Sequence, residues 1–320
     1  MTVNTSTLRN WQRVGQRGIY GLSLLDLART NHSIYAISAD LGNSSGLDRF
    51  RRDIPDRFLN IGISEQHMIG FASGLSSLGN NVFVSSFAPF LSLRAGEQVR
   101  MNLSYMRSNV KLVSIGSGIS MGYLGNSHFG LEDVSIIRSL PNIPIFQPSD
   151  CYELNQILKY LSDFDGPAYV RLTGIAPNPS VFNPDYIFKP GSVVHHRSGC
   201  DLLVLTSGSI LSSVLLAADS LPGSSIEVCS LPSLWPLAKD IVEIISSFPS
   251  VLIVDEHSAV GGLSTIVAES LLGSESVLFS RISSVSLPAQ YLTSGTYEDL
   301  LDKYGFSVSS LAFKMKSLIP

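Results

Sequence analysis

Short β-rich runs alternate with helical patterns through the first half of this chain, and this alternation constrains the fold more than any other feature. Strands are predicted at 33–38, 81–86, 110–116, 143–148 and 167–172, and helices at 65–78, 90–107, 131–140 and 150–162. Repeated strand–helix units are typical of a parallel sheet covered by helices on both faces. The sequence therefore predicts a doubly wound α/β domain over residues 1–175.

A second alternating set follows a proline-rich stretch. Residues 173–192 contain four prolines and two glycines, a composition typical of a linker. Strands are then predicted at 201–209, 225–232, 250–256 and 277–283, and helices at 210–220, 239–247, from 262 onward and near 297–305. The sequence predicts a linker over 176–198 and a second, smaller α/β domain over 199–320.

Charge and cysteine content exclude several classes of protein. The net charge of -4 leaves no basic surface for nucleic acid. Cys151, Cys200 and Cys229 stand far apart without a CxxC motif, which argues against a disulfide scaffold and a zinc site and fits a reducing compartment. No apolar run approaches the roughly 18 residues of a membrane span. We expect a cytoplasmic protein that binds neither nucleic acid nor membrane.

Four segments rich in Gly, Ser or Asn come directly after predicted strands. They read ADLGNSSG, SSFAPF, GSGISMGYLGNSHFG and RLTG. Ligands of open parallel sheets bind beyond the carboxyl ends of the strands, where a glycine-rich backbone can approach them closely. The sequence predicts a ligand site along this edge.

One carboxylate, Glu65, stands at the start of an otherwise apolar predicted helix, between Ser64 and Gln66. A carboxyl group in apolar surroundings has a raised pKa and can donate a hydrogen bond. An acid in the first turn is also favoured by the helix dipole, so the position alone leaves a structural role open.

Four stretches, in this order along the chain, resemble the C-terminal half of transketolases. GISEQHMIGFASGL is similar to the family's glutamate motif, and SSFAPFLSLRAGEQVRM to its aromatic segment. LEDVSIIRSLPNIPIFQPSD resembles the helix and strand that follow its substrate loop, and VDEHSAVGGLSTIVAE a motif of its C-terminal domain. The resemblance covers about residues 12 to 318.

The resemblance implies a cofactor and a partner. Transketolases use thiamin diphosphate, bound between subunits, and a separate N-terminal domain holds the diphosphate and its metal ion through a GDG…N motif. No GDG occurs in this chain. The resemblance therefore implies the pyrimidine-binding half of a split enzyme, with an N-terminal partner subunit in a two-plus-two heterotetramer. The partner would hold the Mg2+ or Ca2+ ion, and this chain would contribute no metal ligand.

The same resemblance implies cofactor-binding residues by position. Glu65 would hydrogen-bond the pyrimidine nitrogen and so allow the cofactor to remove its own thiazolium proton. Phe87 and Phe90 would face the pyrimidine ring, with Phe87 as the stacking residue, although phenylalanines are more often plain core residues. Asp40 would lie near the thiazolium side, unless its Asp-Leu-Gly sequence only makes a turn.

Further positions match the family's substrate-binding residues. His128 would hydrogen-bond substrate oxygens and transfer protons, a role that suits an imidazole near its neutral pKa. Arg17, Ser44 and Arg171 fall where the family binds the acceptor's phosphate, for which a guanidinium offers paired donors. Exposed arginines without a ligand are the alternative.

The substrate loop departs from the family pattern. Sugar-phosphate transketolases read roughly HDSIGxGEDGPTHQPIE there, whereas this chain has Gly116, Tyr123 and Leu124 in place of a histidine, a glutamate and the hydroxyl-reading aspartate. A buried hydroxyl facing Leu124 would lose a partner, at a cost of about 1–3 kcal/mol. We therefore expect a modified or less hydroxylated sugar rather than ordinary pentose phosphates.

The resulting hypothesis is a transferase that moves a two-carbon ketol unit from a ketose to an aldose and works only with its partner. One alternative is the β subunit of a 2-oxoacid dehydrogenase or a deoxyxylulose-phosphate-synthase-like enzyme, which would release carbon dioxide. The other is a non-catalytic regulatory subunit, against which the retention of Glu65 argues.

Overall fold

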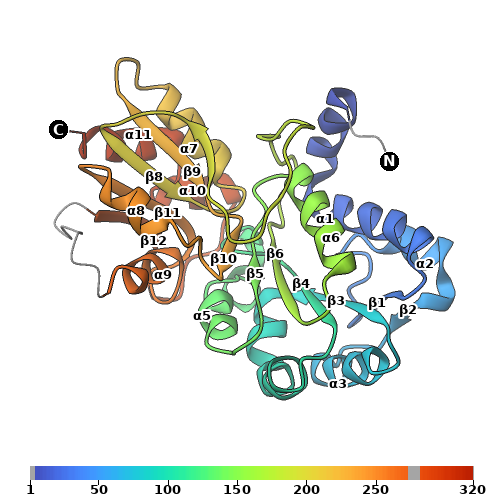
Figure 1. Cartoon of the computed structure of the whole chain (residues 1–320). Coiled ribbons are helices and arrows are strands. Elements are labelled where there is room, and N and C mark those ends of the chain that lie inside the picture. The colour runs from blue at the N-terminus through green and yellow to red at the C-terminus, as the bar shows by residue number, and fades with distance from the viewer. Residues whose placement is uncertain (1–3, 273–281, 320) are drawn as a thin grey trace.

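Two α/β units make up the computed structural model, which describes residues 4–272 and 282–319 (Figure 1). The first is built on a seven-stranded sheet of order β10-β5-β6-β4-β3-β1-β2, and the second on a five-stranded sheet of order β12-β11-β8-β9-β7. Neighbouring strands are parallel except for the pairs β10–β5 and β7–β9. The predicted fold class, two doubly wound α/β units with mainly parallel sheets, is confirmed.

The predicted strands and helices of the first unit all have counterparts. The strands are β1 (Ile34–Ser38), β2 (Phe58–Asn60), β3 (Asn81–Phe87), β4 (Val110–Ile115), β5 (Ile145–Phe146), β6 (Ala168–Leu172) and β10 (Ser233–Trp235). The helices are α1 (Thr5–Thr30), α2 (Asp48–Asp53), α3 (Glu65–Ser76), α4 (Gly96–Gln98), α5 (Asp133–Arg138) and α6 (Cys151–Asp163), with short turns η1 (Pro55–Arg57) and η4 (Gly122–Ser127). Strand β10 comes from the later part of the chain and extends the first sheet.

The second unit contains the predicted alternation, together with an edge strand at 194–197 inside the predicted linker and a last helix at 308–316 that were not predicted. Its strands are β7 (Val194–Arg197), β8 (Leu202–Thr206), β9 (Ile226–Ser230), β11 (Val251–Ser258) and β12 (Ile282–Leu287). Its helices are α7 (Leu211–Asp219), α8 (Ile241–Ser246), α9 (Leu263–Ser270), α10 (Tyr297–Lys303) and α11 (Val308–Lys316). Most of the strand predicted at 277–283 lies outside the described residues. None of the described helices has the length and apolar character needed to cross a membrane.

Helix α1 has no counterpart among the predicted elements. Asn4 caps it by accepting a hydrogen bond from the Thr7 backbone N–H at 2.9 Å. The helix is kinked at Gly15, where φ is +77° and where a Cβ atom would lie 2.9 Å from the Ile175 carbonyl oxygen. Glycine at this point therefore lets α1 pack against the end of the first unit, a contact that local periodicity does not report.

The helix predicted at 90–107 is present, but much of it is wound more widely than an α-helix. It runs as η2 (Phe90–Arg94), α4 and η3 (Val99–Tyr105), and both η segments are π-helical. The Ala95 N–H bonds the Phe90 carbonyl at 3.1 Å, five residues back. Such turns are rare and are often found at functional sites.

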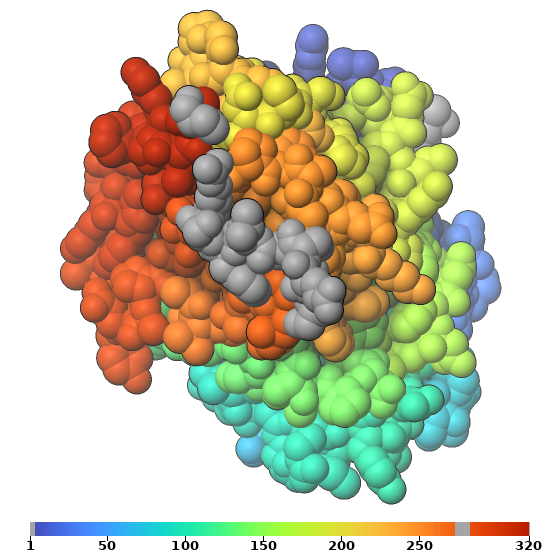
Figure 2. Space-filling view, turned by 60° about the vertical axis from the view of Figure 1, so that its left-hand side comes forward, coloured from blue at the N-terminus to red at the C-terminus, as the bar shows by residue number. Residues whose placement is uncertain are grey.

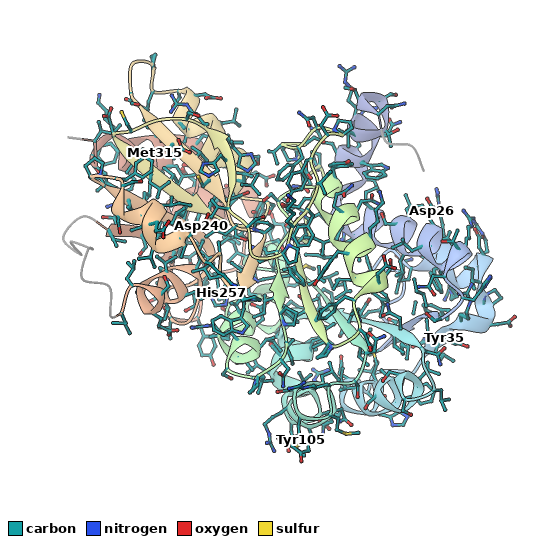
Figure 3. All side chains as sticks on the ribbon, viewed as in Figure 1. Asp26, Tyr35, Tyr105, Asp240, His257 and Met315 are labelled. Carbon is teal, nitrogen blue, oxygen red and sulfur yellow. The ribbon has the colours of Figure 1, made fainter. Side chains whose placement is uncertain are left out.

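The two units pack directly against each other, as Figure 2 shows for the second unit (yellow to red) and the first, and they share a buried apolar cluster. One buried cluster includes Ile145 and Tyr169 of the first sheet together with Leu203 and Leu263 of the second unit. His257, labelled in Figure 3, lies at this junction and is fully buried. The second unit is thus part of the framework that positions the first sheet's strand ends.

Candidate active site

Glu65 begins α3 and points into the protein, with only 2% of its surface exposed. Its Oε1 accepts a hydrogen bond from the Ser86 hydroxyl at 3.2 Å, and its Oε2 lies 2.9 Å from Nη1 of Arg94. The carboxylate is buried as expected, but it is paired with a guanidinium that was not predicted. These contacts fix Glu65 at the carboxyl end of β3.

An aromatic cluster adjoins this ion pair. Phe87 ends β3, Phe90 begins η2, and His128 follows η4. The ring centroids of Phe87 and Phe90 are 5.7 Å apart, and the His128 ring lies 4.9 Å from Phe87 and 5.4 Å from Phe90, all edge to face. The guanidinium carbon of Arg94 lies 4.1 Å from the Phe90 ring centre. The fold therefore brings Glu65, Phe87, Phe90 and His128 together, with Arg94 between them.

Arg94 also acts on His128. Partial burial, and then the positive charge of Arg94, lower the pKa of the His128 imidazole below its ordinary value. A depressed pKa keeps the ring neutral at lower pH, so it can accept a proton from a hydroxyl group. Its Nδ1 lies 2.9 Å from the Ser127 hydroxyl. The spacing of Arg94, four residues after Phe90 on a predicted helix, was the available signal for this residue.

Replacing Arg94 by methionine is expected to raise the pKa of His128, because the lowering charge disappears while the burial remains. The imidazole signal of His128 in an NMR titration measures this directly. Arg100→Met is the control, because Arg100 lies on the same helical segment but pairs with the exposed Glu97 at 2.7 Å. An unchanged His128 titration in Arg94→Met would refute the proposed coupling.

Asp40 adopts a strained backbone conformation beyond the end of β1. Its φ of +60° is unusual for a residue with a side chain, and such strain is found mainly at functional sites. Asn60 of β2 holds the turn: its Oδ1 accepts the Asp40 N–H at 2.9 Å, and its Nδ2 donates to Asp40 Oδ1 at 3.0 Å. Asn60 was not predicted, because β2 itself was not among the predicted strands.

The residues expected to bind phosphate separate into two groups. Arg17 and Ser44 are neighbours, since Nη1 of Arg17 donates to the Ser44 carbonyl at 3.4 Å. Arg171 is not placed with them, because its side chain is fully buried between the two units. Its Nε donates to Asp133 at 3.0 Å, and its Nη2 donates to the carbonyl of Gly130 at 2.7 Å. An exposed phosphate cannot reach a guanidinium in that position, so the structure gives Arg171 a structural role.

The substrate loop shows why glycine stands at position 116. Gly116 has φ +81°, and a Cβ atom there would lie 2.6 Å from Cγ of Met121 and 3.4 Å from the Phe87 ring. Met121 fills the space next to the aromatic cluster. Tyr123 and Leu124 lie on η4, and both are exposed in this chain. The loop therefore presents apolar side chains where the family pattern has charged ones.

The second unit holds this loop in place through Glu256 of β11. The Glu256 carboxylate accepts the Ile119 N–H at 2.9 Å and the Tyr297 hydroxyl at 2.6 Å. A Cβ atom on Gly118 would come within 2.2 Å of Glu256 Oε1, so the loop fits against this carboxylate only with glycine there. Glu256 is thus a positioning residue for the segment that carries His128.

Glu256 is also expected to make stability depend on pH. Burial raises its pKa to about 7 from the ordinary value of 4.5. Between these values the folded chain binds a proton that the unfolded chain has lost, so this group's contribution to stability falls as pH rises. Relative to Glu256→Gln, the free energy of unfolding of the wild type should fall by up to about 3 kcal/mol as pH rises from 4.5 to 7, and should fall no further above pH 7.

Denaturant unfolding of both proteins across this pH range measures the difference. The exposed Glu243 on α8 offers a control substitution, Glu243→Gln. A stability difference between wild type and Glu256→Gln that stays constant from pH 4.5 to 7 would show that Glu256 does not titrate as expected.

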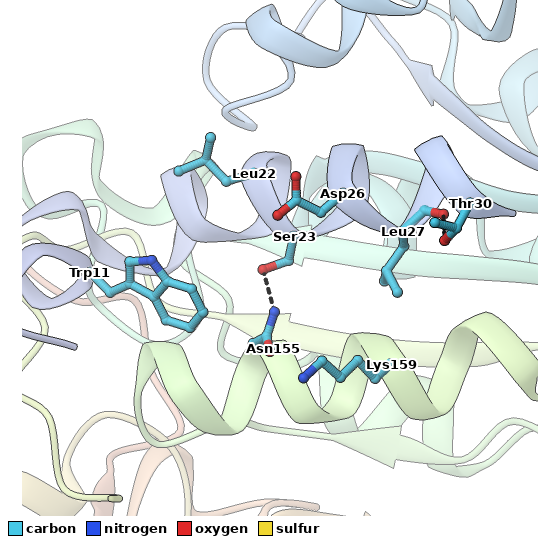
Figure 4. A pocket seen from close by; sticks show the side chains of 8 residues that line it. All are labelled: Trp11, Leu22, Ser23, Asp26, Leu27, Thr30, Asn155 and Lys159. Carbon is cyan, nitrogen blue, oxygen red and sulfur yellow. Dashed lines mark hydrogen bonds between the residues drawn. The ribbon is translucent and has the colours of Figure 1, made fainter. Parts of the chain in front are cut away.

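A separate hollow of about 220 Å³ lies between α1 and α6 (Figure 4). It is lined by Trp11, Leu22, Ser23, Asp26, Leu27, Thr30, Asn155 and Lys159. Asn155 donates to the Ser23 hydroxyl at 2.9 Å within it. None of these residues belongs to the Glu65 cluster, so the hollow does not form part of the candidate active site.

Family comparisons agree with this geometry. The family model of the transketolase pyrimidine-binding domain matches residues 13–176, about half of the chain, and that of the transketolase C-terminal domain matches residues 191–311. The chain belongs to the transketolase family. It corresponds to the C-terminal half of these enzymes, which confirms the resemblance found in the sequence.

Several relatives are named as sections or subunits of transketolases. A putative transketolase C-terminal section of Methanocaldococcus jannaschii is 32% identical over 93% of this chain and 94% of that protein. One of the subunits of the apulose-4-phosphate transketolase of Phocaeicola vulgatus is 32% identical over 92% of this chain and 96% of its own. The expectation of a transketolase-like transferase that works with a partner is confirmed.

A solved structure supports the same assignment. The chain matches a split-gene transketolase, described as an inactive β4 tetramer, with a TM-score of 0.85, 32% identity and coverage of 96% of this chain and 99% of that one. Dependence on thiamin diphosphate follows from the family. The buried carboxyl group of Glu65 and the apolar rings of Phe87 and Phe90, at the carboxyl edge of the sheet, are suited to a hydrogen bond with an aminopyrimidine ring and to contact with its faces.

Proposed function

We propose that this chain is the pyrimidine-binding component of a two-component transketolase that transfers a two-carbon ketol unit from a modified ketose to an aldose. The observation that carries the proposal is the cluster of Glu65, Arg94, Phe90, Phe87 and His128 at the carboxyl end of β3. It combines a buried carboxylate, apolar ring faces and a neutral imidazole in one place.

The roles of these residues follow from their chemistry. Glu65 binds the pyrimidine ring through its buried carboxyl group, and Phe87 and Phe90 exclude water from the same space. His128 moves a proton at a substrate hydroxyl. Thiamin diphosphate, when bound, supplies the nucleophilic carbon and takes up the electrons of the broken carbon–carbon bond. Asp40 orients the site from the neighbouring strand, and Arg17 with Ser44 binds the acceptor's phosphate.

The partner is proposed to be an N-terminal transketolase subunit that holds the diphosphate and its Mg2+ or Ca2+ ion. Apolar side chains are exposed just before and after α3 (Ile63 and Leu78) and on or next to η2 and η3 (Leu93, Tyr105 and Met106). Tyr105 projects away from the protein body (Figure 3). Positions Gly70 and Gly74 on the outer face of α3 have open space around them, so another backbone can approach closely. We propose a two-plus-two heterotetramer on this face, located in the cytoplasm.

The substrate is proposed to be a modified or less hydroxylated sugar. Relatives include components of transketolases for apulose-4-phosphate and for 6-deoxy-6-sulfo-D-fructose. Met121 beside Gly116, and Leu124 in place of a hydroxyl-reading aspartate, support a pocket of this kind. Neither Gly116 nor Leu124 has a polar side chain that could hydrogen-bond an additional substrate hydroxyl group.

Calorimetry with the chain alone and with its N-terminal partner tests the proposal. Thiamin diphosphate with magnesium should bind tightly only to the complex, and the complex should then transfer a ketol unit without releasing carbon dioxide. Release of carbon dioxide from a ketoacid would favour the decarboxylating alternative. Absence of cofactor binding to the complex would favour the non-catalytic one. Ordinary pentose phosphates used at typical transketolase efficiency would refute the proposed substrate class.

A further inference from the structure

Three different metal-ligating side chains meet in the second unit, where the edge strand β7 pairs with β9. Glu227 and Cys229 are two residues apart on β9, so their side chains lie on the same face of the sheet. The antiparallel register places His195 of β7 directly opposite Cys229. Opposed residues of paired strands share a face, so sheet geometry alone brings all three side chains together.

The distances between the ligand atoms are close to those of a tetrahedral metal site. Sγ of Cys229 lies 3.3 Å from Nδ1 of His195 and 3.6 Å from Oε1 of Glu227. Nδ1 of His195 and Oε1 of Glu227 form a hydrogen bond of 2.6 Å. Zinc bond lengths give ligand–ligand separations of about 3.3–3.8 Å. Two separations already match, and the third must open by less than about 1 Å when the ion replaces the hydrogen bond.

We propose that His195, Glu227 and Cys229 bind one Zn2+ ion, with water in the fourth position. A thiolate, an imidazole and one carboxylate favour a borderline divalent ion over the hard ions Mg2+ and Ca2+. Cys229 and Glu227 are buried, whereas the His195 side chain is 56% exposed and can rotate toward an entering ion. The site is therefore open to solvent on one side, as a water ligand requires.

A supporting contact orients the carboxylate. Oε2 of Glu227 accepts the backbone N–H of Gly199 at 2.8 Å, which leaves Oε1 directed toward His195 and Cys229. Outer contacts of this kind fix ligand orientation in metal sites. A Cβ atom on Gly199 would lie 2.3 Å from the Ile226 carbonyl carbon, so glycine allows this approach. The adjacent His196 bonds Ser230 instead and is not part of the trio.

The ion would tie the edge strand to the sheet. β7 has one sheet neighbour, β9, and it follows directly on the segment that connects the two units. A zinc ion bridging the two strands would stabilise that strand pair and the connection. This role is independent of ketol transfer, because none of the three residues belongs to the Glu65 cluster, and it differs from the Mg2+ or Ca2+ ion proposed for the partner.

Titration of the full-length chain with Co2+, a coloured substitute for Zn2+, tests the site. We expect one Co2+ per chain, a thiolate-to-cobalt charge-transfer band, and displacement of the ion by Zn2+. Zn2+ at about a hundredfold above its Kd should raise the unfolding temperature by about 4 °C. Cys229→Ser should abolish the charge-transfer band. The control variant Cys200→Ser should retain it, because Cys200 is exposed and is not one of the three ligands.

His195→Ala provides a second variant, because its exposed side chain can be removed without leaving a buried gap. It should weaken Co2+ binding at least tenfold even if Cys229→Ser folds poorly. The proposal is overturned if the wild type binds no stoichiometric Co2+ at micromolar free metal. It is equally overturned if binding persists unchanged in His195→Ala, because the ion would then sit elsewhere. Neither outcome depends on ketol-transfer activity, so this test fails or succeeds separately from the proposed function.

Discussion

Glu65→Gln should lower the ketol-transfer rate of the assembled enzyme by about 10²–10⁴-fold, the range that one positioned acid–base group contributes. The amide is nearly the same size as the carboxyl group, so packing around α3 is expected to survive. Its oxygen can still accept the Arg94 hydrogen bond that Glu65 accepts at 2.9 Å, and its nitrogen can donate to the Ser86 hydroxyl. The amide has no ionisable proton to exchange with a bound pyrimidine ring, so function is lost while structure is kept.

The test compares steady-state rates of wild type and Glu65→Gln in the complex with the partner, alongside thermal unfolding of each chain. Glu97→Gln is the control, since Glu97 is also a helical glutamate, on α4, but is exposed and accepts hydrogen bonds from Arg100. It should retain its rate. If Glu65→Gln keeps the wild-type rate, the buried acid serves only the start of α3, and the roles proposed for the cofactor site are wrong.

Asp133→Ala should destabilise the chain by roughly 3–5 kcal/mol, because it removes the ion-pair partner of a buried guanidinium. Asp133 and Arg171 form an ion pair at 3.0 Å, with side-chain exposures of 1% and 0%. Tyr169 adds a hydrogen bond to Asp133 at 2.8 Å. Burial alone would raise the pKa of Asp133, but the positive charge of Arg171 holds that pKa well below its ordinary value.

Urea unfolding of Asp133→Ala measures this loss. Glu97→Ala is the control, because its pair with Arg100 is exposed and such pairs contribute under about 1 kcal/mol. Arg171→Met then separates the two roles considered for Arg171. A structural role predicts lower stability with an unchanged KM for the phosphorylated acceptor in enzyme that remains folded. A raised KM at unchanged stability would restore the phosphate-binding role.

Local sequence predicted the strands and helices that carry the candidate site. The apolar run after Glu65 and the Gly-, Ser- or Asn-rich segments after four of the five predicted strands led us to expect a site at the carboxyl edge of the first sheet, because strand and helix periodicity is a property of neighbouring residues. The partners of these residues were not predictable in the same way. Arg94 is 29 residues from Glu65, and Glu256 is 137 residues from Ile119. Only folding decides which distant side chains meet.

Two residues illustrate that limit. Arg171 stands at a strand end, where an exposed phosphate ligand is a reasonable expectation, but the second unit packs over it and buries it. His195 and Cys229 are separated by 34 residues without any metal-binding spacing, so the sequence predicted no zinc site. Strand pairing between β7 and β9 brings them to 3.3 Å.

The sequence by itself determined two mainly parallel α/β units and an acid at the start of α3, and it predicted a ligand-binding edge on the first unit. Each of these depends on residues that are close together along the chain. The tertiary structure alone decided that Arg94 pairs with Glu65, that Glu256 holds the substrate loop and that Arg171 is buried. These outcomes depend on contacts between segments far apart in sequence, whose energies no local pattern records.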